Sequence, residues 1–199
     1  MQEKLTRKEA KERTRQRLLD GLLDVAREEG LQGLTTTKIA EAAGVAQSSF
    51  YFHFEGMEQA MGAAADKLGN QVREAIRAER RKIDLQNPTE TLRGVQAATM
   101  NAFLAEPMFA QLFLRHRRDP TSPLGETFAE LLNESRRELA NDMKKYLASL
   151  PHPEVYAELF IGMSMAMIEG ILDGRLDREA CLDVLVHMVG STLANPPGK

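Results

Sequence analysis

The sequence predicts an all-α protein in which an N-terminal three-helix head, containing a helix-turn-helix, is fused through a long helix to a larger helical body. Two observations predict this class. Apolar residues recur at helical spacing over almost the whole chain, and no segment has the alternation typical of a convincing strand. Proline, glycine and short polar segments separate the helical stretches. We place the head at residues 1–57 and the body at residues 58–199.

The first helix is predicted to begin at Thr6 or Arg13 and to end at Glu29, because Gly30 follows its last turn. Its apolar stripe faces the core of the head and consists of Leu18, Leu19, Leu22, Val25 and Ala26. We expect three further apolar residues to close this small core, namely Leu31, Leu34 and Ile39.

The following segment, residues 35–57, has the pattern of a helix-turn-helix. A short helix with Ile39 on its apolar face is interrupted by Gly44, and a second short helix opens at Ala46 or Gln47. In a helix-turn-helix the second helix lies in the major groove of DNA. The pattern therefore indicates a DNA-binding head, although helix pairs joined at a glycine also occur in proteins that never bind DNA.

The body begins with a helix predicted to start near Glu58 and to continue to Ile83, long enough to connect head and body as a rigid rod. Proline-containing loops then separate the remaining helices. They are expected at residues 89–104, 107–118, 124–150, 154–173 and 178–193.

The helix at residues 154–173 differs from the others because its sequence LFIGMSMAMIEGIL is apolar on nearly every side. Such a helix cannot keep a fully wetted face. Small residues that would let a second helix approach closely are Gly162, Ser164, Ala166 and Gly170. We expect a subunit interface here, with a central core helix of a monomer as the alternative. No run of about 18 apolar residues occurs, so no membrane span is expected.

The exposed face of the second short helix has side chains suited to DNA. Gln47, Ser48 and Ser49 stand at its N-terminus, where a recognition helix meets base edges. Other side chains nearby can donate hydrogen bonds to phosphate oxygens, and these are Thr36, Thr37, Lys38, Tyr51 and His53.

Residues 14–61 resemble the N-terminal domain of TetR-family transcriptional regulators. The resemblance rests on a threonine-rich start at residues 35–37, an A-x-x-A-G-V motif at residues 40–45 and a Y-x-H-F motif at residues 51–54. It implies that Tyr51 and His53 contact phosphate and that residues 47–49 face the bases. It also implies a dimer, because the last two helices of such regulators usually pair with their copies in a four-helix bundle.

One position departs from the family pattern. Family members commonly have a lysine shortly after the H-F pair, at the start of the fourth helix, where it contacts DNA phosphate. This chain has Met57 there, so one expected contact is missing, which bears on the strength of binding rather than on its mode.

Charge is distributed unevenly along the chain. The net charge of −3 argues against a protein that coats nucleic acid over its whole surface. Residues 1–18, however, contain seven basic and three acidic residues, a local charge of +4. Such a basic N-terminal arm beside a helix-turn-helix can add phosphate contacts. The alternative is a solvated segment whose mixed charges pair along the helix.

Other residue patterns bear on compartment and chemistry. No secretory signal is recognisable, and the single cysteine, Cys181, cannot form an internal disulfide, which favours the cytoplasm. We expect Cys181 to be a buried, inert thiol. The four histidines are far apart, and no HExxH, phosphate loop or nucleophile elbow occurs. We therefore expect no enzyme activity, metal site or cofactor, although scattered residues can still converge in space.

Several helices of the body carry large, soft apolar residues that could line an adaptable pocket or form an ordinary core. The ligand-binding candidates, with two polar side chains that could orient a ligand, are Met100, Phe103, Phe109, Phe113, His116, Phe128, Met163, Met167 and Glu169. Glu169 lies between isoleucines of the apolar helix, where a carboxylate needs a partner. Residues 113–128, together with Met57, resemble regulators of fatty-acid metabolism within the family, which suggests a fatty-acyl effector.

The sequence thus predicts a DNA-binding transcriptional regulator of the cytoplasm. The expected mode is a ligand-released repressor that acts as a homodimer on a palindromic, double-stranded DNA operator and responds to an apolar small molecule. The alternative is a helical adaptor or lipid-binding protein whose head no longer binds DNA.

Overall fold

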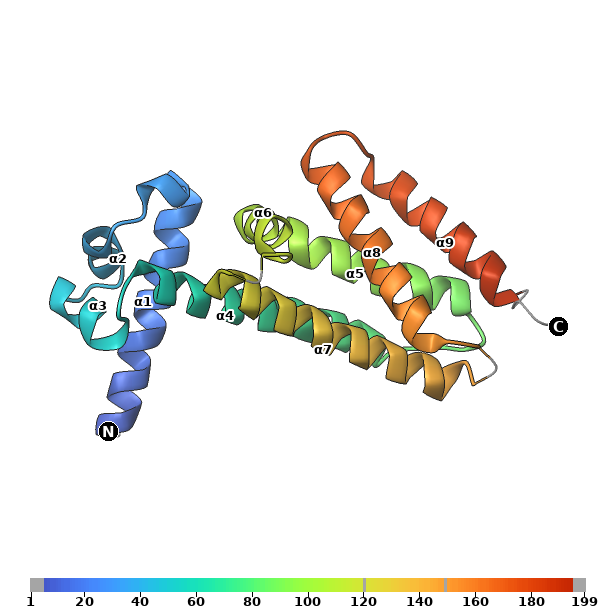
Figure 1. The fold of residues 1–199 in the computed structure, drawn as a ribbon, viewed down its shortest axis with the longest axis horizontal. Helices are drawn as coiled ribbons and strands as arrows, with labels where there is room; N and C mark the ends of the chain where they lie inside the picture. Colours follow the sequence, from blue (N-terminus) through green and yellow to red (C-terminus); the bar gives the residue numbers. More distant parts are fainter. Residues whose placement is uncertain (1–5, 120, 149, 195–199) are drawn as a thin grey trace, which may run out of the picture.

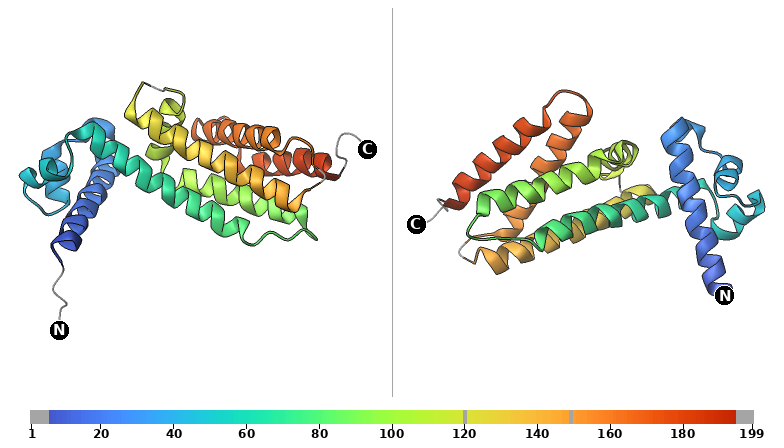
Figure 2. Two further views of the ribbon diagram at one scale, coloured as in Figure 1. Left: turned by 60° about the horizontal axis from the view of Figure 1, so that its bottom comes forward. Right: turned by 180° about the vertical axis from the view of Figure 1, so that it is seen from behind.

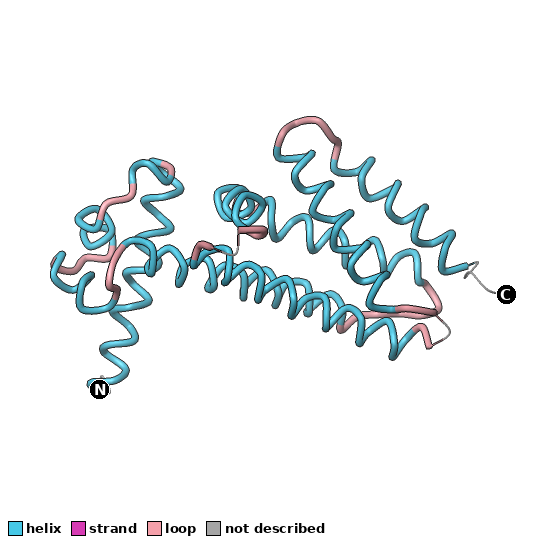
Figure 3. The backbone as a smooth tube through the Cα atoms, viewed as in Figure 1, coloured by secondary structure: helices cyan, strands magenta, loops and turns pink. Residues whose placement is uncertain are grey.

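The computed structural model describes residues 6–119, 121–148 and 150–194. Within these ranges the chain forms α-helices and one 3₁₀ turn, with no strand. A small head of short helices stands at one end of a long helical body, and the two termini lie at opposite ends of the molecule (Figures 1 and 2). Loops are short and lie between the helices (Figure 3). The all-α class and the head-and-body arrangement are confirmed.

The head contains α1 (Arg7–Glu29), a 3₁₀ turn (Leu31–Gly33), α2 (Thr36–Ala42) and α3 (Gln47–His53). The earlier of the two predicted starts of α1 is correct, because Thr6 and Glu9 form a reciprocal capping box that satisfies the first backbone N–H groups. The helix ends at Gly30, which has a φ of 72°. Leu18, Leu19 and Leu22 are buried as predicted.

The turn between α2 and α3 depends on Gly44, whose φ of 62° is rarely adopted by residues with a side chain. Val45 closes the turn, since its backbone N–H donates to the carbonyl of Ala40 at 2.9 Å. On the other side of the head, α1 crosses α2 at Gly21, which is buried and closely approached by the backbone of α2. These two glycines let the two short helices α2 and α3 pack closely against α1.

α4 (Met57–Arg80) begins in the head and continues into the body as one unbroken helix. Its first turns present Ala60 and Ala64 to the core of the head, while Leu68 and Val72 are buried further along. Buried residues of the head and body belong to one continuous apolar cluster that α4 connects. The predicted rigid connection therefore matches the structure, with the helix ending three residues before the expected Ile83.

The body adds five further helices within the described residues. They are α5 (Pro88–Leu104), α6 (Pro107–His116), α7 (Pro123–Tyr146), α8 (Pro153–Leu172) and α9 (Arg178–Ala194). The first four begin with a proline. Proline suits the first helical position because an N–H there would have no partner within the helix, and because its φ is already close to the helical value. The starts of these helices therefore lie within one residue of those expected.

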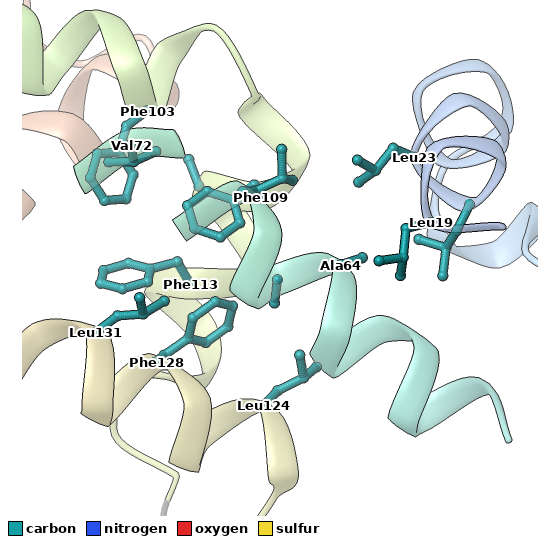
Figure 4. Packing of buried hydrophobic residues seen from close by; sticks show 14 of the residues in the cluster. Leu19, Leu23, Ala64, Val72, Phe103, Phe109, Phe113, Leu124, Phe128 and Leu131 are labelled. Atoms are coloured by element: carbon teal, nitrogen blue, oxygen red, sulfur yellow. The ribbon is translucent and has the colours of Figure 1, made fainter. Parts of the chain in front are cut away.

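An aromatic cluster forms the centre of the body near α4. Phe103 of α5, Phe109 and Phe113 of α6 and Phe128 of α7 pack with ring centroids between 5.1 and 6.1 Å apart. Figure 4 shows these rings facing one another, with Leu131 beside them and Ala64 of α4 between them and α1. This cluster packs α6 against α5 and α7.

Ion pairs join α4 to α7 (Pro123–Tyr146). Arg77 and Arg80 both pair with Glu138, and Arg80 also donates to Asp142 at 2.6 Å. Arg73 pairs with Glu134 one turn closer to the head. The Arg77 guanidinium, followed by the charges of Arg80 and Arg73, lowers the pKa of the Glu138 carboxyl. The two long helices are thus connected by charge as well as by apolar contacts.

α8 and α9 form one side of the body (Figure 1). Several of their apolar side chains are exposed to solvent. The residues concerned are Val155, Leu159, Val184 and Met188, each between 51 and 58% exposed. By length and composition alone α8 could cross a membrane, but a core helix of a soluble protein has the same character. Leu159 and Met188 of this face also line an apolar groove of the body.

Candidate DNA-binding surface and ligand cavities

The face of α3 that the sequence assigned to DNA is turned to solvent. Gln47 and Ser48 are exposed and Ser49 is half-buried, whereas Phe50 on the opposite face is completely buried. Phe50 packs against Phe54 in the core of the head, with ring centroids 5.5 Å apart. The apolar side therefore anchors the short helix, and its polar side is presented outward.

Three of the predicted contact residues are hydrogen-bonded to one another. Gln47 Nε2 donates to Thr36 Oγ1 at 3.0 Å, and the Tyr51 hydroxyl lies 3.4 Å from the same oxygen. These bonds connect the start of α2 to α3. Because Tyr51 remains 59% exposed, its hydroxyl is positioned and still accessible to an external acceptor.

The other two predicted phosphate contacts at the start of α2, Thr37 and Lys38, differ in whether their side chains are already bonded within the protein. Thr37 is exposed and has no role in the helix cap, which is provided by Thr35 through its bond from the N–H of Lys38 at 3.2 Å. The Lys38 ammonium pairs with Glu29 at the end of α1. A phosphate contact by Lys38 would therefore have to compete with this half-exposed carboxylate.

His53, at the end of α3, is half-buried, and its Nδ1 has no hydrogen-bond partner among the described residues. Desolvation lowers the pKa of its imidazole, and the positive charges of Lys11 and Arg15 lower it further. The side chain therefore favours the neutral form, in which one ring nitrogen is a donor.

Met57 lies at the start of α4 and packs against the core of the head. Its thioether cannot replace the ammonium donor expected at this position. The side chain at this position therefore offers no ammonium group to a DNA phosphate.

The body contains a cavity of about 90 Å³ among α4, α5, α6, α7 and α8. Three predicted ligand residues, Phe103, Phe109 and Phe113, line it. A larger groove of about 450 Å³ lies next to it, towards the far end of the body, and Met163 is among its lining residues. The two spaces share Arg80, Val95, Leu139 and Phe160 as walls.

The other five candidates line neither space. Met100 and Phe128 are completely buried in the core, and Met167 packs against it. His116 is half-buried. Glu169 is exposed to solvent, and its negative charge acts on the guanidinium of Arg117.

Polar residues around the cavity went unnoticed in the sequence. Arg73, Thr99 and Ser164 line it, and Ser164 Oγ donates to Gln96 Oε1 at 2.9 Å. Gln96 is completely buried, and its Nε2 has no partner among the described residues. The sequence signal for this residue is a glutamine between two apolar residues, Val95 and Ala97, on an amphipathic helix.

A contact between head and body also escaped sequence analysis. Arg27 near the end of α1 donates two hydrogen bonds to Glu106, at 2.6 and 3.2 Å. Glu106 is the residue immediately before α6, which carries two of the cavity phenylalanines. Phe109, which lines the cavity, is thus three residues away from Glu106, which is bonded to the head.

Two further observations concern reactive groups in the described part of the chain. No cluster of three or more histidine, cysteine, aspartate or glutamate side chains there is arranged to hold a metal ion. Cys181 is buried, as predicted, and desolvation raises the pKa of its thiol, so the reactive thiolate is disfavoured.

Residues 18–64 match the family model of bacterial regulatory proteins of the tetR family. In addition, a segment of 75 residues is 33% identical to an HTH-type transcriptional regulator of Haemophilus influenzae. That match spans 37% of this chain and 37% of the relative, little more than a third of its length. The family model covers α2 and α3 completely, together with the neighbouring parts of α1 and α4.

Solved structures resemble the whole chain. A TetR-family transcriptional regulator from Rhodococcus sp. is 16% identical, with a TM-score of 0.68 over 92% of this chain and 99% of that one. A TetR-family regulator from Syntrophomonas wolfei is 14% identical, with a TM-score of 0.72 over 94% and 97%. The fatty acid degradation regulator FadR from Bacillus halodurans is 18% identical, with a TM-score of 0.66 over 98% of both chains. At these identities the likeness shows a shared fold.

Proposed function

We propose that this chain, a TetR-family transcriptional regulator, is a homodimeric repressor that leaves a palindromic operator when an apolar ligand enters its body. The observation that carries the proposal is the solvent-facing polar side of α3, anchored from behind by Phe50. Gln47, Ser48 and Ser49 are assigned to base edges. Phosphate contacts are assigned to Thr36, Thr37, Lys38, Tyr51 and His53.

The exposed apolar side of α8 and α9 supports the homodimer. A two-fold interface uses the same patch on both copies, so it covers the exposed side chains of both subunits at once. Gly162 on α8 has nothing within 4 Å of the position its Cβ would take, which leaves room for a second helix. Two heads related by this axis would contact half-sites about 34 Å apart, one turn of DNA.

The apolar groove supports the choice of ligand. Its volume of about 450 Å³ falls within the range of small-molecule sites, and its walls are mainly aliphatic and aromatic side chains with two tyrosines, Tyr146 and Tyr156. Arg80 at the junction with the cavity is already paired with Glu138 and Asp142. A ligand with a long apolar part fits these walls, and the fold shared with a fatty acid degradation regulator favours a fatty-acyl compound.

Coupling between ligand and DNA is assigned to two connections. α4 runs from the head past the cavity, and Arg27 of α1 is bonded to Glu106 at the start of α6. A ligand that extends from the groove past the shared wall into the cavity would displace Phe109 and Phe113. It would thereby move α6 and weaken the contact between Glu106 and the head. A coupling free energy of about 1–3 kcal/mol would change DNA affinity roughly 5- to 150-fold.

The test begins with selection of binding sites from random double-stranded DNA by the full-length protein. We expect enrichment of an inverted repeat, and native mass spectrometry should show a dimer, with any co-purified ligand revealed by its extra mass. Long-chain acyl compounds should then release the selected DNA. Absence of any enriched sequence would overturn the proposal, and acyl binding without DNA binding would favour a lipid-binding protein instead. The cytoplasm is the proposed location.

A further inference from the structure

A row of cations continues the buried face of α1 beyond the core of the head. On a helical wheel of about 100° per residue, Arg7, Lys8, Lys11 and Arg15 fall within an arc of roughly 100°. The same arc contains the core residue Leu18. These four residues, here called the α1 basic face, therefore point to the side of α1 on which the head packs.

Aromatic rings at the end of α3 hold two members of this face. Lys11 Nζ lies 5.0 Å from the centre of the Phe52 ring, and the Arg15 guanidinium lies 5.2 Å from that of Phe54. Phe52 is 68% exposed and packs on His53, with ring centroids 5.2 Å apart. Cation–π contact orients both charges and leaves them unneutralised, because neither forms a salt bridge with a carboxylate among the described residues.

The acidic residues of the same helix segment are engaged elsewhere. Glu9 Oε2 accepts from the backbone N–H of Thr6 at 2.7 Å in the capping box. Glu12 accepts from Gln16 at 2.8 Å, and both carboxylates fall outside the arc of the basic face. The local acids therefore leave the cations available to an external anion.

The basic face is also close to the surface assigned to DNA. The first turns of α1 extend past α2 and α3 as continuous helix (Figures 1 and 2). The positive charges of Lys11 and Arg15 reach His53 at the end of α3, where they help to lower its pKa. An anion bound by α3 would thus lie in the field of the same cations.

We propose that the α1 basic face is a second DNA contact, which binds backbone phosphates beside the bases that α3 contacts. The inference rests on the proposed function and extends its DNA surface to a helix outside the helix-turn-helix. Lysine and arginine bind phosphate without regard to sequence, so this contact adds affinity and salt dependence but no base preference.

The experiment compares the salt dependence of operator binding for the wild type and Lys8→Gln/Lys11→Gln. Each phosphate contact contributes about 0.9 to the slope of log K against log salt concentration. Loss of two contacts per head, or four per dimer, should reduce the slope by about 3 to 4. Arg13→Gln is the matched control, because Arg13 is exposed on the opposite side of the same helix and should leave the slope unchanged.

The outcomes separate the two proposals. If the wild type selects no DNA sequence, the proposed function itself fails. If the wild type binds its operator but the double variant keeps the wild-type slope, only the basic-face contact is wrong. Co-sedimentation of the wild type with phosphatidylserine vesicles, lost in the double variant while the DNA slope is unchanged, would assign the face to a membrane surface and overturn the proposal.

Discussion

Replacing Gly21 by alanine tests whether the head depends on close approach of α1 and α2. A Cβ at this position would lie 2.9 Å from both Ala43 N and Ile39 O. Both atoms belong to the backbone of α2 and its cap, which cannot rotate away as a side chain would. The contact therefore forces the helices apart or strains their geometry.

The magnitude follows from two opposing effects. Alanine favours the helix over glycine by about 0.5–1 kcal/mol, whereas overpacking in a closely packed core costs about 1–3 kcal/mol. The net loss of stability for Gly21→Ala is therefore between about 0 and 2.5 kcal/mol. Gly62→Ala in α4 is the matched control, since nothing lies within 4 Å of its new Cβ. It should stabilise the protein by about 0.5–1 kcal/mol.

Thermal unfolding followed by circular dichroism measures the difference. For a chain of this size each kcal/mol changes Tm by about 2–4 °C. Because both variants gain the same helix preference, they differ by the overpacking cost of about 1–3 kcal/mol, which should separate their Tm values by roughly 2–12 °C. Gly21→Ala should also weaken DNA binding, because α2 supports α3. A Gly21→Ala protein stabilised as much as Gly62→Ala would refute the close-packing argument.

The remaining predictions concern charge, contact and coupling. Because its folded-state pKa is lowered, Glu138 stabilises the protein above its unfolded pKa near 4.5, and this stability is lost as pH falls through the lower folded value. Glu138→Gln should therefore lower Tm at pH 7 and converge with the wild type in acid, and a constant difference would contradict this. Tyr51→Phe should weaken binding to all DNA sequences alike, whereas Gln47→Ala should relax preference at particular base pairs of the selected operator. Arg27→Glu and Glu106→Arg should each weaken the ligand effect on DNA binding, and the charge-reversed double variant should restore it, with a coupling energy of up to about 1 kcal/mol for this half-exposed pair.

Local signals in the sequence were sufficient for the helices. Proline at the first position and glycine at the end of helices act within a few residues, so boundaries such as Pro107 and Gly30 could be predicted. The start of α1 required choosing between Thr6 and Arg13, and the capping box with Glu9 decided it. That S/T-x-x-E pattern was visible in the sequence and was not used.

The candidate site was predictable only where it is local. The α3 surface lies within a short segment, so its residues could be assigned together. Arg27 and Glu106 are 79 positions apart, and each is an ordinary charged residue at a helix end. Phe103 lines the cavity and Phe128 does not, although both are buried in the same core and both occupy apolar positions of their helices. Such distinctions depend on tertiary packing that periodicity does not contain.

The exposed apolar face of α8 and α9 sets a bound on how strongly two copies can associate. Burying a large aliphatic side chain contributes about 1.5–3 kcal/mol, and Val155, Leu159, Val184 and Met188 are each about half exposed, so each offers about 1 kcal/mol. Two-fold symmetry doubles the set to eight side chains and about 8 kcal/mol. Association itself costs an estimated 4–15 kcal/mol. These side chains alone therefore give a marginal dimer, and a stable one must also bury the partly covered residues around Gly162. Gly162→Leu should consequently weaken the dimer seen by analytical ultracentrifugation while leaving each subunit folded, and an unchanged dimer would place the interface elsewhere.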